Sequence, residues 1–203
     1  MAATVEHYDE LIEETGFEEG TVLVVTGATI DEVADALEAD RHGTVDPADV
    51  AAAEAPTHAM YSFVQLDGGV LAAEDTGYAD PPVSALVALS SGGRSAAVVR
   101  DNIQAHARFA CARDGALLFD ADEYVFVADR SGVPAELRAL FDRAWVDLDA
   151  DEHDVEDPLA VALAMAEVVT GIEVTVEDVE RAASRDAVRL PVPALRYVPE
   201  AEA

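Results

Sequence analysis

Residues 95–119 read SAAVVRDNIQAHARFACARDGALLF, and this stretch predicts three consecutive strands. Asp101 and Asn102 supply turn residues after the first strand, and residues 113–115 connect the second strand to the third. The Asp-Gly pair in that connection is a strong hairpin signal, because a type I′ turn needs a positive φ at both central residues. A meander of this kind has a face to bury, so we expect helices elsewhere in the chain to cover it.

The segments before this meander predict further strands and a helix. Residues 21–26 form an uninterrupted run rich in β-branched side chains, which is typical of a central strand. Thr29 and Glu32 are spaced as a capping box at the start of an amphipathic helix. Residues 60–66 and 70–74, joined by an Asp-Gly turn, predict a second hairpin.

The last third of the chain predicts mainly helices. Asp157 and Pro158 fit the N-cap and first position of a helix that Gly171 ends. Thr175 and Asp178 then cap one more short helix. Helices in this region therefore follow the strands instead of alternating with them.

Together these elements predict an α+β fold. We expect a largely antiparallel sheet of five or six strands covered by helices, with a helical carboxyl-terminal third. Residues 1–185 are expected to form a single domain. Residues 186–203 contain several prolines and predict an irregular tail.

The charge of the chain indicates where the protein works. There are 42 acidic residues against 12 basic ones, giving a net charge of -30, and every basic residue is Arg. Self-repulsion of such a charge destabilises a compact state at low ionic strength, but the Debye length falls to roughly 3 Å in about 1 M salt. The composition therefore predicts a halophilic protein of a salt-rich cytoplasm. An acidic protein that binds basic partners is the alternative, while a hydrophobic content of 51% argues against disorder.

The same charge argues against two classes of partner. Nucleic-acid binding depends on Lys and Arg that neutralise phosphates, and an acidic surface is repelled by anionic lipid. No run approaches about 18 apolar residues, and the acidic amino terminus does not resemble a signal peptide. We therefore expect a soluble cytoplasmic protein that binds neither nucleic acid nor membranes.

The acidic run 147–157 is the first candidate for a metal site. Asp147, Asp149 and Asp151 match the first three ligand positions of a helix-loop-helix calcium motif. That motif also needs Gly at position six and Glu at position twelve, where this chain has Glu152 and Pro158. We therefore expect a solvated acidic linker and no metal site, with these three aspartates as candidates only for weak cation binding.

Other common reaction centres are not indicated. The five histidines are scattered and Cys111 has no second cysteine, so zinc ligation has little support. Cys111 and His106 are five residues apart on one expected strand, which sends them to opposite faces and favours a buried structural cysteine over a Cys-His dyad. Residues 24–30 lack both a glycine-rich phosphate motif and a lysine. No cofactor is expected.

One polar cluster on the meander is a candidate binding site. The cluster lies on or beside one hairpin and consists of Arg100, Asp101, Asn102, His106 and Arg108. If these side chains share a face, they could form a recognition patch on an otherwise acidic surface. The alternative is an ordinary solvated strand face, since antiparallel sheets commonly alternate apolar and polar side chains.

Several segments resemble an uncharacterised family of proteins of similar length that is common in actinobacteria and known only as a domain of unknown function. The resemblance lies in the order and spacing of residues 26–37 (TGATIDEVADAL), 68–77 (GGVLAAEDTG), 86–94 (LVALSSGGR), 108–117 (RFACARDGAL) and 160–171 (AVALAMAEVVTG). That family usually has a Trp at the place of Val70 and aromatic residues near 100–103, which this chain lacks. The resemblance implies a shared fold and no established activity.

Two functions are consistent with the sequence. We favour a non-catalytic protein that binds an unknown protein partner in a regulatory, accessory or immunity-like role, with a homodimer as a further possibility. The alternative is a small-ligand-binding protein or enzyme with a polar cleft around Arg100, Asp101, His106 and Arg108. A pocket lined by these residues would support the alternative, and an exposed flat or apolar surface would support partner binding.

Overall fold

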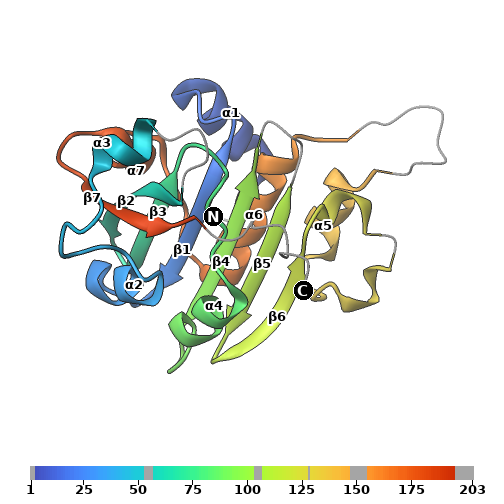
Figure 1. Cartoon of the computed structure of the whole chain (residues 1–203). Helices are drawn as coiled ribbons and strands as arrows, with labels where there is room; N and C mark the ends of the chain where they lie inside the picture. Colours follow the sequence, from blue (N-terminus) through green and yellow to red (C-terminus); the bar gives the residue numbers. More distant parts are fainter. Residues whose placement is uncertain (1–2, 53–56, 103–106, 128, 147–154, 195–203) are drawn as a thin grey trace, which may run out of the picture.

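Seven strands form one antiparallel sheet in the computed structural model of the chain (Figure 1). The structure describes residues 3–52, 57–102, 107–127, 129–146 and 155–194. The strands are β1 (Gly20–Thr26), β2 (His58–Leu66), β3 (Gly69–Glu74), β4 (Ser95–Asp101), β5 (Arg108–Arg113), β6 (Ala116–Ala121) and β7 (Val188–Pro193), arranged in the order β6-β5-β4-β1-β3-β2-β7. The α+β class is confirmed, but the prediction of five or six strands is wrong, because β7 adds a seventh.

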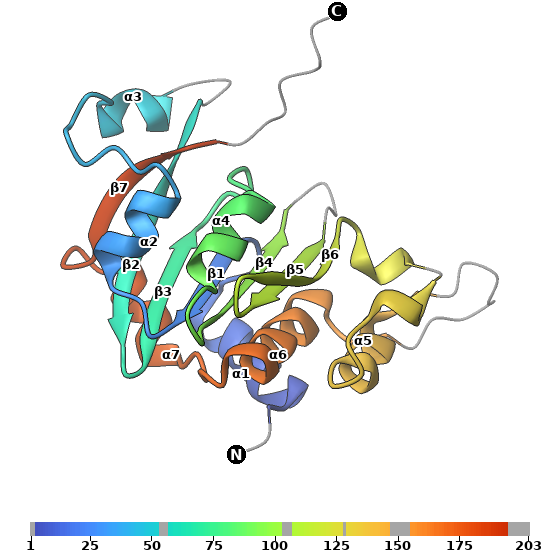
Figure 2. The ribbon, with the colours of Figure 1, turned by 90° about the horizontal axis from the view of Figure 1, so that it is seen from below.

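Helices cover both faces of the sheet (Figure 2). They are α1 (Val5–Thr15), α2 (Ile30–Ala36), α3 (Pro47–Ala52), α4 (Val83–Leu89), α5 (Arg138–Ala144), α6 (Pro158–Thr170) and α7 (Val176–Ala183), with two short 3-10 helices, η1 (Tyr124–Phe126) and η2 (Arg130–Gly132). Helices α2 and α4 lie on one face, which we call the α4 face. Helices α1, α6 and α7 lie on the other, which we call the α6 face.

Strand β1 occupies the middle of the sheet, as its β-branched run predicts. Leu23 and Val25 belong to the core of the α4 face, and Val22 and Val24 belong to the core of the α6 face. All four side chains are buried, because a strand covered by helices on both faces has no solvent-facing side. The central strand therefore needs an uninterrupted apolar sequence.

The meander is formed by β4, β5 and β6, as the sequence predicts. Arg113 pairs with Ala116 across the second turn, which leaves Asp114 and Gly115 as its two central residues. Their φ angles are 51° and 76°, the positive values that a type I′ turn requires. The turn sequence thus sets the pairing of β5 with β6.

Three helix starts follow their predicted caps. The side chains of Thr29 and Thr175 each accept a hydrogen bond from the backbone N–H three residues further along the chain. The acidic side chain at that position, Glu32 or Asp178, accepts in turn from the backbone N–H of the threonine. The Asp157 side chain accepts from the first turn of α6, and Gly171 ends that helix in the left-handed conformation with φ 70°. Local hydrogen bonds therefore fix the helix ends that the sequence predicts.

Part of the expected carboxyl-terminal tail belongs to the sheet. The prediction of an irregular tail from residue 186 is wrong for β7, which pairs antiparallel with β2 and buries Val192. Pro191 and Pro193 are compatible with this strand because β7 lies at the edge of the sheet, where one side of the backbone needs no strand partner. The prolines thus mark an edge strand and not the absence of structure.

Candidate functional site

Arg100 and Arg108 lie directly opposite each other on β4 and β5. Both side chains point to the α4 face, because they alternate with Val99 and Phe109, which pack in the core of the α6 face. The two arginines are only 4% and 5% exposed. Two buried guanidinium groups side by side require nearby negative charge.

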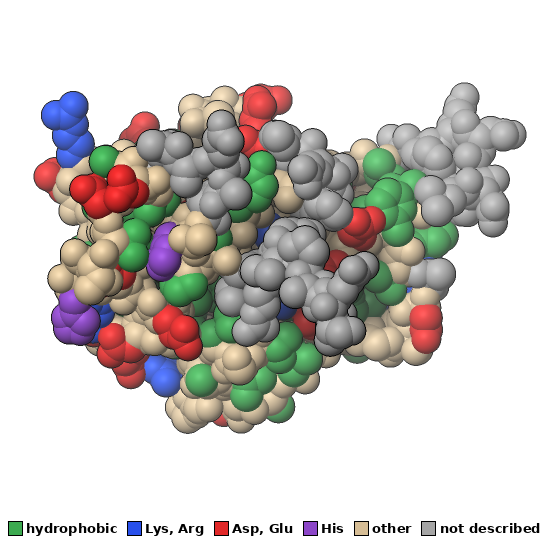
Figure 3. Space-filling view, viewed as in Figure 1, with side chains coloured by type: hydrophobic (Ala, Val, Ile, Leu, Met, Phe, Trp, Pro, Cys, Tyr) green, Lys and Arg blue, Asp and Glu red, His purple; other side chains and the backbone are tan. Residues whose placement is uncertain are grey.

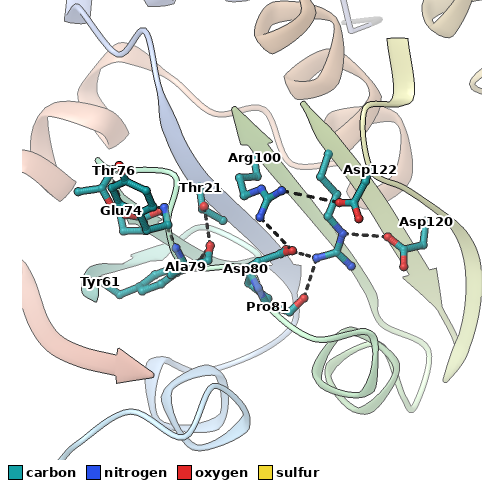
Figure 4. A network of polar contacts seen from close by, with 12 residues as sticks. Thr21, Tyr61, Glu74, Thr76, Ala79, Asp80, Pro81, Arg100, Asp120 and Asp122 are labelled. Atoms are coloured by element: carbon teal, nitrogen blue, oxygen red, sulfur yellow. Dashed lines mark hydrogen bonds and ion pairs between the residues drawn. The ribbon is translucent and has the colours of Figure 1, made fainter. Parts of the chain in front are cut away.

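Asp80 supplies charge to both arginines (Figure 4). One carboxylate oxygen accepts from Nη1 of Arg100 at 3.2 Å, and the other accepts from Nη1 of Arg108. Arg108 also donates to the carbonyl oxygen of Pro81 at 2.8 Å and through Nε to Asp120 at 2.9 Å, while Asp122 lies 3.7 Å from Arg100. Asp80 is therefore the shared centre of a buried ion cluster.

The loop that carries Asp80 is held at its other end by a second polar network (Figure 4). The buried Glu74 carboxylate accepts from the backbone N–H and hydroxyl of Thr76, and from the backbone N–H of Ala79. The carbonyl oxygen of Ala79 accepts in turn from the hydroxyl groups of Thr21 at 2.7 Å and Tyr61 at 3.4 Å. Residues 75–81 are thus fixed across the end of the sheet.

These contacts limit what the arginines can do chemically. Their guanidinium groups bind carboxylates of the same chain, so they are largely neutralised before any ligand arrives. The Nε of Arg100 is buried and has no hydrogen-bond partner among the described residues. Burial raises the pKa of Tyr61 well above its ordinary value, with Glu74 and Asp80 adding negative charge nearby, so the Tyr61 hydroxyl remains a donor. The cluster is built as a clamp between the loop and the sheet.

Of the other residues of the predicted cluster, the structure separates Asp101 from the two arginines. Asp101 follows Arg100 directly in β4, so its side chain lies toward the α6 face. Burial, together with the charges of Asp157 and Glu19, raises the pKa of Asp101 to about 6. Asn102 is buried at the end of the strand. His106 lies outside the described residues.

The predicted metal candidates and the cysteine have different outcomes. Asp147, Asp149 and Asp151 lie outside the described residues. Within the described ranges, no group of three or more His, Cys, Asp or Glu side chains could hold a metal ion. Cys111 is fully buried, as predicted, and burial raises the pKa of its thiol to about 12. A thiol with such a pKa is a poor nucleophile near neutral pH.

A cavity lies on the α6 face, away from the arginine clamp. Its volume is about 280 Å³, and it is bounded by the sheet and by helices α1, α6 and α7. Apolar side chains supply most of its lining, including Leu11, Leu71 and Leu163. Ser62 and Arg189 add polar groups from β2 and β7.

Sequence reasoning did not identify Asp80 or this cavity. Asp80 is 28 residues from Arg108 in the chain and lies in a loop, so no periodicity links them. The cavity is lined from seven elements, two of which meet only through the unpredicted pairing of β2 with β7. The local signal for the clamp is the pair Arg100 and Arg108, which lie on the two strands of one expected hairpin.

The described part of the chain contains no helix long and apolar enough to cross a membrane. This observation agrees with the absence of a long apolar run in the sequence.

The fold and the clamp define an α+β protein in which helices sandwich one antiparallel sheet and a buried ion cluster fixes the loop before α4. Residues 1–189 match the model of a family described as a family of unknown function, DUF6461. The chain belongs to this family. Searches of the curated proteins and of the solved structures found no match.

Proposed function

We propose that this protein is a non-catalytic, halophilic, cytoplasmic protein that acts by binding a protein partner. The observation that carries the proposal is strand β6, which forms one edge of the sheet and is exposed or half-buried along its length. An edge strand presents unpaired backbone N–H and C=O groups, to which an extended segment of another protein can add as a further strand.

The two edges of the sheet differ in ways that favour β6. At the other edge, Pro191 and Pro193 remove two backbone donors from β7. Strand β6 contains no proline, and its one charged residue, Asp120, binds Arg108 within the chain. Natural proteins protect edge strands with prolines, free charges and bulges, and of these β6 has only the register shift in its pairing with β5 at Cys111 and Ala112.

An apolar surface continues beside this edge. Leu117 in β6 is 43% exposed, and α4 packs against β4, β5 and β6 on the same face as Leu117. Hydrophobic side chains gather over α4 in the lower part of the view in Figure 3. In multimolar salt, long-range charge attraction is screened, so apolar burial and direct hydrogen bonds are the interactions left to hold a partner. A regulatory, accessory or immunity-like role is consistent with such a surface.

The alternative of a polar cleft at the arginine pair has less support. Arg100 and Arg108 already bind Asp80 and Asp120, and the cavity on the α6 face is lined by other residues. A ligand at the pair would have to displace a carboxylate from a buried ion cluster.

Affinity purification from a halophilic host in multimolar KCl tests the proposal. The tagged protein would be compared with Leu117→Glu and with Val188→Glu, a matched control because Val188 is 44% exposed on the opposite edge strand. We expect one stoichiometric partner with the parent protein and the control, and loss of that partner with Leu117→Glu. Equal recovery by both variants, or a protein that runs alone as monomer or dimer, would contradict the proposal.

A further inference from the structure

The cavity on the α6 face is partly open to solvent, and its volume suits a small ligand. Well-packed cores leave few voids larger than a water molecule, whereas an apolar cavity of about 150 Å³ already accepts benzene. The volume here is about 280 Å³. Leu11, Leu71, Leu163 and Ala182 contribute apolar surface from two layers of the fold, so the interior suits an apolar group.

One cationic side chain lies at the edge of this cavity. Arg189 pairs with Ser62 across β7 and β2, and both residues line the cavity. Its Nη2 donates to the carbonyl oxygen of Ala183 at 2.9 Å, which fixes the guanidinium against the end of α7. The remaining N–H groups are the ones available to a ligand.

Arg189 differs from most arginines of this chain. Within the described ranges no carboxylate lies within ion-pair distance of Arg189, although acidic residues outnumber arginines 42 to 12. The two acidic residues that line the cavity are Glu74 and Asp75. Glu74 accepts hydrogen bonds from its own loop on the α4 face, and Asp75 is exposed. Arg189 is itself exposed at the rim, and it is the cationic group of the lining that can hydrogen-bond an anionic ligand.

We propose that this cavity binds a small monocarboxylate with an apolar body, whose carboxylate is held by Arg189 and Ser62. A guanidinium group binds carboxylates through paired hydrogen bonds, and the hydroxyl of Ser62 can donate one more. The apolar body fills the space between the sheet and the three helices. This site is independent of strand β6, because the two lie on different elements and at opposite ends of the sheet.

Calorimetric titration of the full-length protein in multimolar KCl tests this proposal with 4-phenylbutyrate as the probe. The neutral 4-phenylbutanol and the cationic 4-phenylbutylamine have the same apolar body and serve as matched ligands. We expect saturable 1:1 binding of the carboxylate, and binding about tenfold weaker for the alcohol, since a hydrogen bond to a charged group is lost. No saturable binding of the carboxylate, or tighter binding of the amine, would overturn the proposal.

Two pairs of variants locate the site. Arg189→Gln is expected to weaken binding of 4-phenylbutyrate about tenfold. Arg185→Gln removes the same charge from a residue that does not line the cavity, and it is expected to have no effect. Ala182→Leu fills the cavity and is expected to abolish binding, while Ala88→Leu on the exposed side of α4 is its control. Circular dichroism checks that each variant is folded. If Arg189→Gln binds 4-phenylbutyrate with unchanged affinity, Arg189 does not hold the carboxylate. That conclusion stands whether or not Ala182→Leu abolishes binding.

Discussion

Asp80 is the residue on which the ion cluster depends. It neutralises two guanidinium groups that are almost fully buried, whereas the Asp122 side chain is 73% exposed and lies 3.7 Å from Arg100. Removing one partner from a buried ion cluster leaves uncompensated charge, whereas exposed ion pairs contribute little.

We therefore expect Asp80→Asn to lower the free energy of unfolding by about 3 kcal/mol. Asp122→Asn, the matched control, should lower it by less than about 1 kcal/mol. Urea denaturation in multimolar KCl measures both values. Similar losses in the two variants would show that Asp80 does not hold the clamp.

Asp101 gives the protein a specific pH dependence. Burial raises its pKa to about 6 in the folded state, against about 3.9 for an unfolded Asp. The folded state therefore binds this proton more tightly, so the contribution of Asp101 to stability is full below pH 4 and is lost as the pH rises through 6.

Replacing Asp101 with Asn removes this effect. We expect Asp101→Asn to stabilise the protein at pH 7 by about 1 kcal/mol, a value reduced for the partial exposure of the side chain, and to leave stability at pH 4 almost unchanged. The measurement is the difference in unfolding free energy between variant and parent from pH 4 to 7.5. A difference that does not change with pH would contradict the assigned pKa.

Only part of the ion cluster could be predicted from the sequence. Arg100 and Arg108 could be recognised as a pair, because the hairpin places them opposite each other. Asp101 should have been separated from them, since neighbours in a strand point to opposite faces. The partner Asp80 could not be found, because a loop residue has no periodicity that links it to a distant strand.

The loop of residues 75–81 is the element that the clamp positions. Gly77 has a φ of +64°, and a Cβ there would lie 2.6 Å from both the Cβ of Asn102 and the carbonyl oxygen of Asp101. Gly92, at the end of α4, has a φ of +76° but open space around it. The two glycines share the conformational requirement and differ in packing.

This contrast predicts different costs for the same substitution. Gly92→Ala is expected to cost about 1 kcal/mol for its left-handed backbone. Gly77→Ala adds a backbone clash and is expected to cost about 3 kcal/mol in unfolding free energy. Thermal or chemical denaturation of the two variants compares them, and equal costs would mean that the loop is not closely packed on β4.

Turns and helix caps could be predicted from the sequence because neighbouring residues determine them. Strand β7 could not be predicted in this way. The turn of Asp114 and Gly115 and the caps at Thr29 and Asp157 depend on neighbouring residues, so they can be read directly. Strand β7 was missed because its prolines suggest irregular structure, and only its position at the edge of the sheet makes them acceptable.

The net charge of -30 acts on the molecule as a whole. Raising KCl from about 0.1 M to about 3 M shortens the Debye length several-fold and removes most of the self-repulsion. We expect the unfolding temperature to rise by about 10 °C, which corresponds to about 3 kcal/mol for a domain of this size. Scanning calorimetry measures the shift, with sorbitol at matched osmolality as the uncharged control. An equal shift in sorbitol would assign the effect to solvent exclusion and not to charge.

Partner binding through β6 is the central claim about the molecule, and hydrogen–deuterium exchange tests it most directly. The protein would be compared in multimolar KCl with and without the partner recovered by affinity purification. Because an added strand hydrogen-bonds to the free edge, we expect the partner to slow exchange of the backbone amides of β6 (Ala116–Ala121) and to leave those of β7 unchanged. Protection on other elements with none on β6 would contradict the claim.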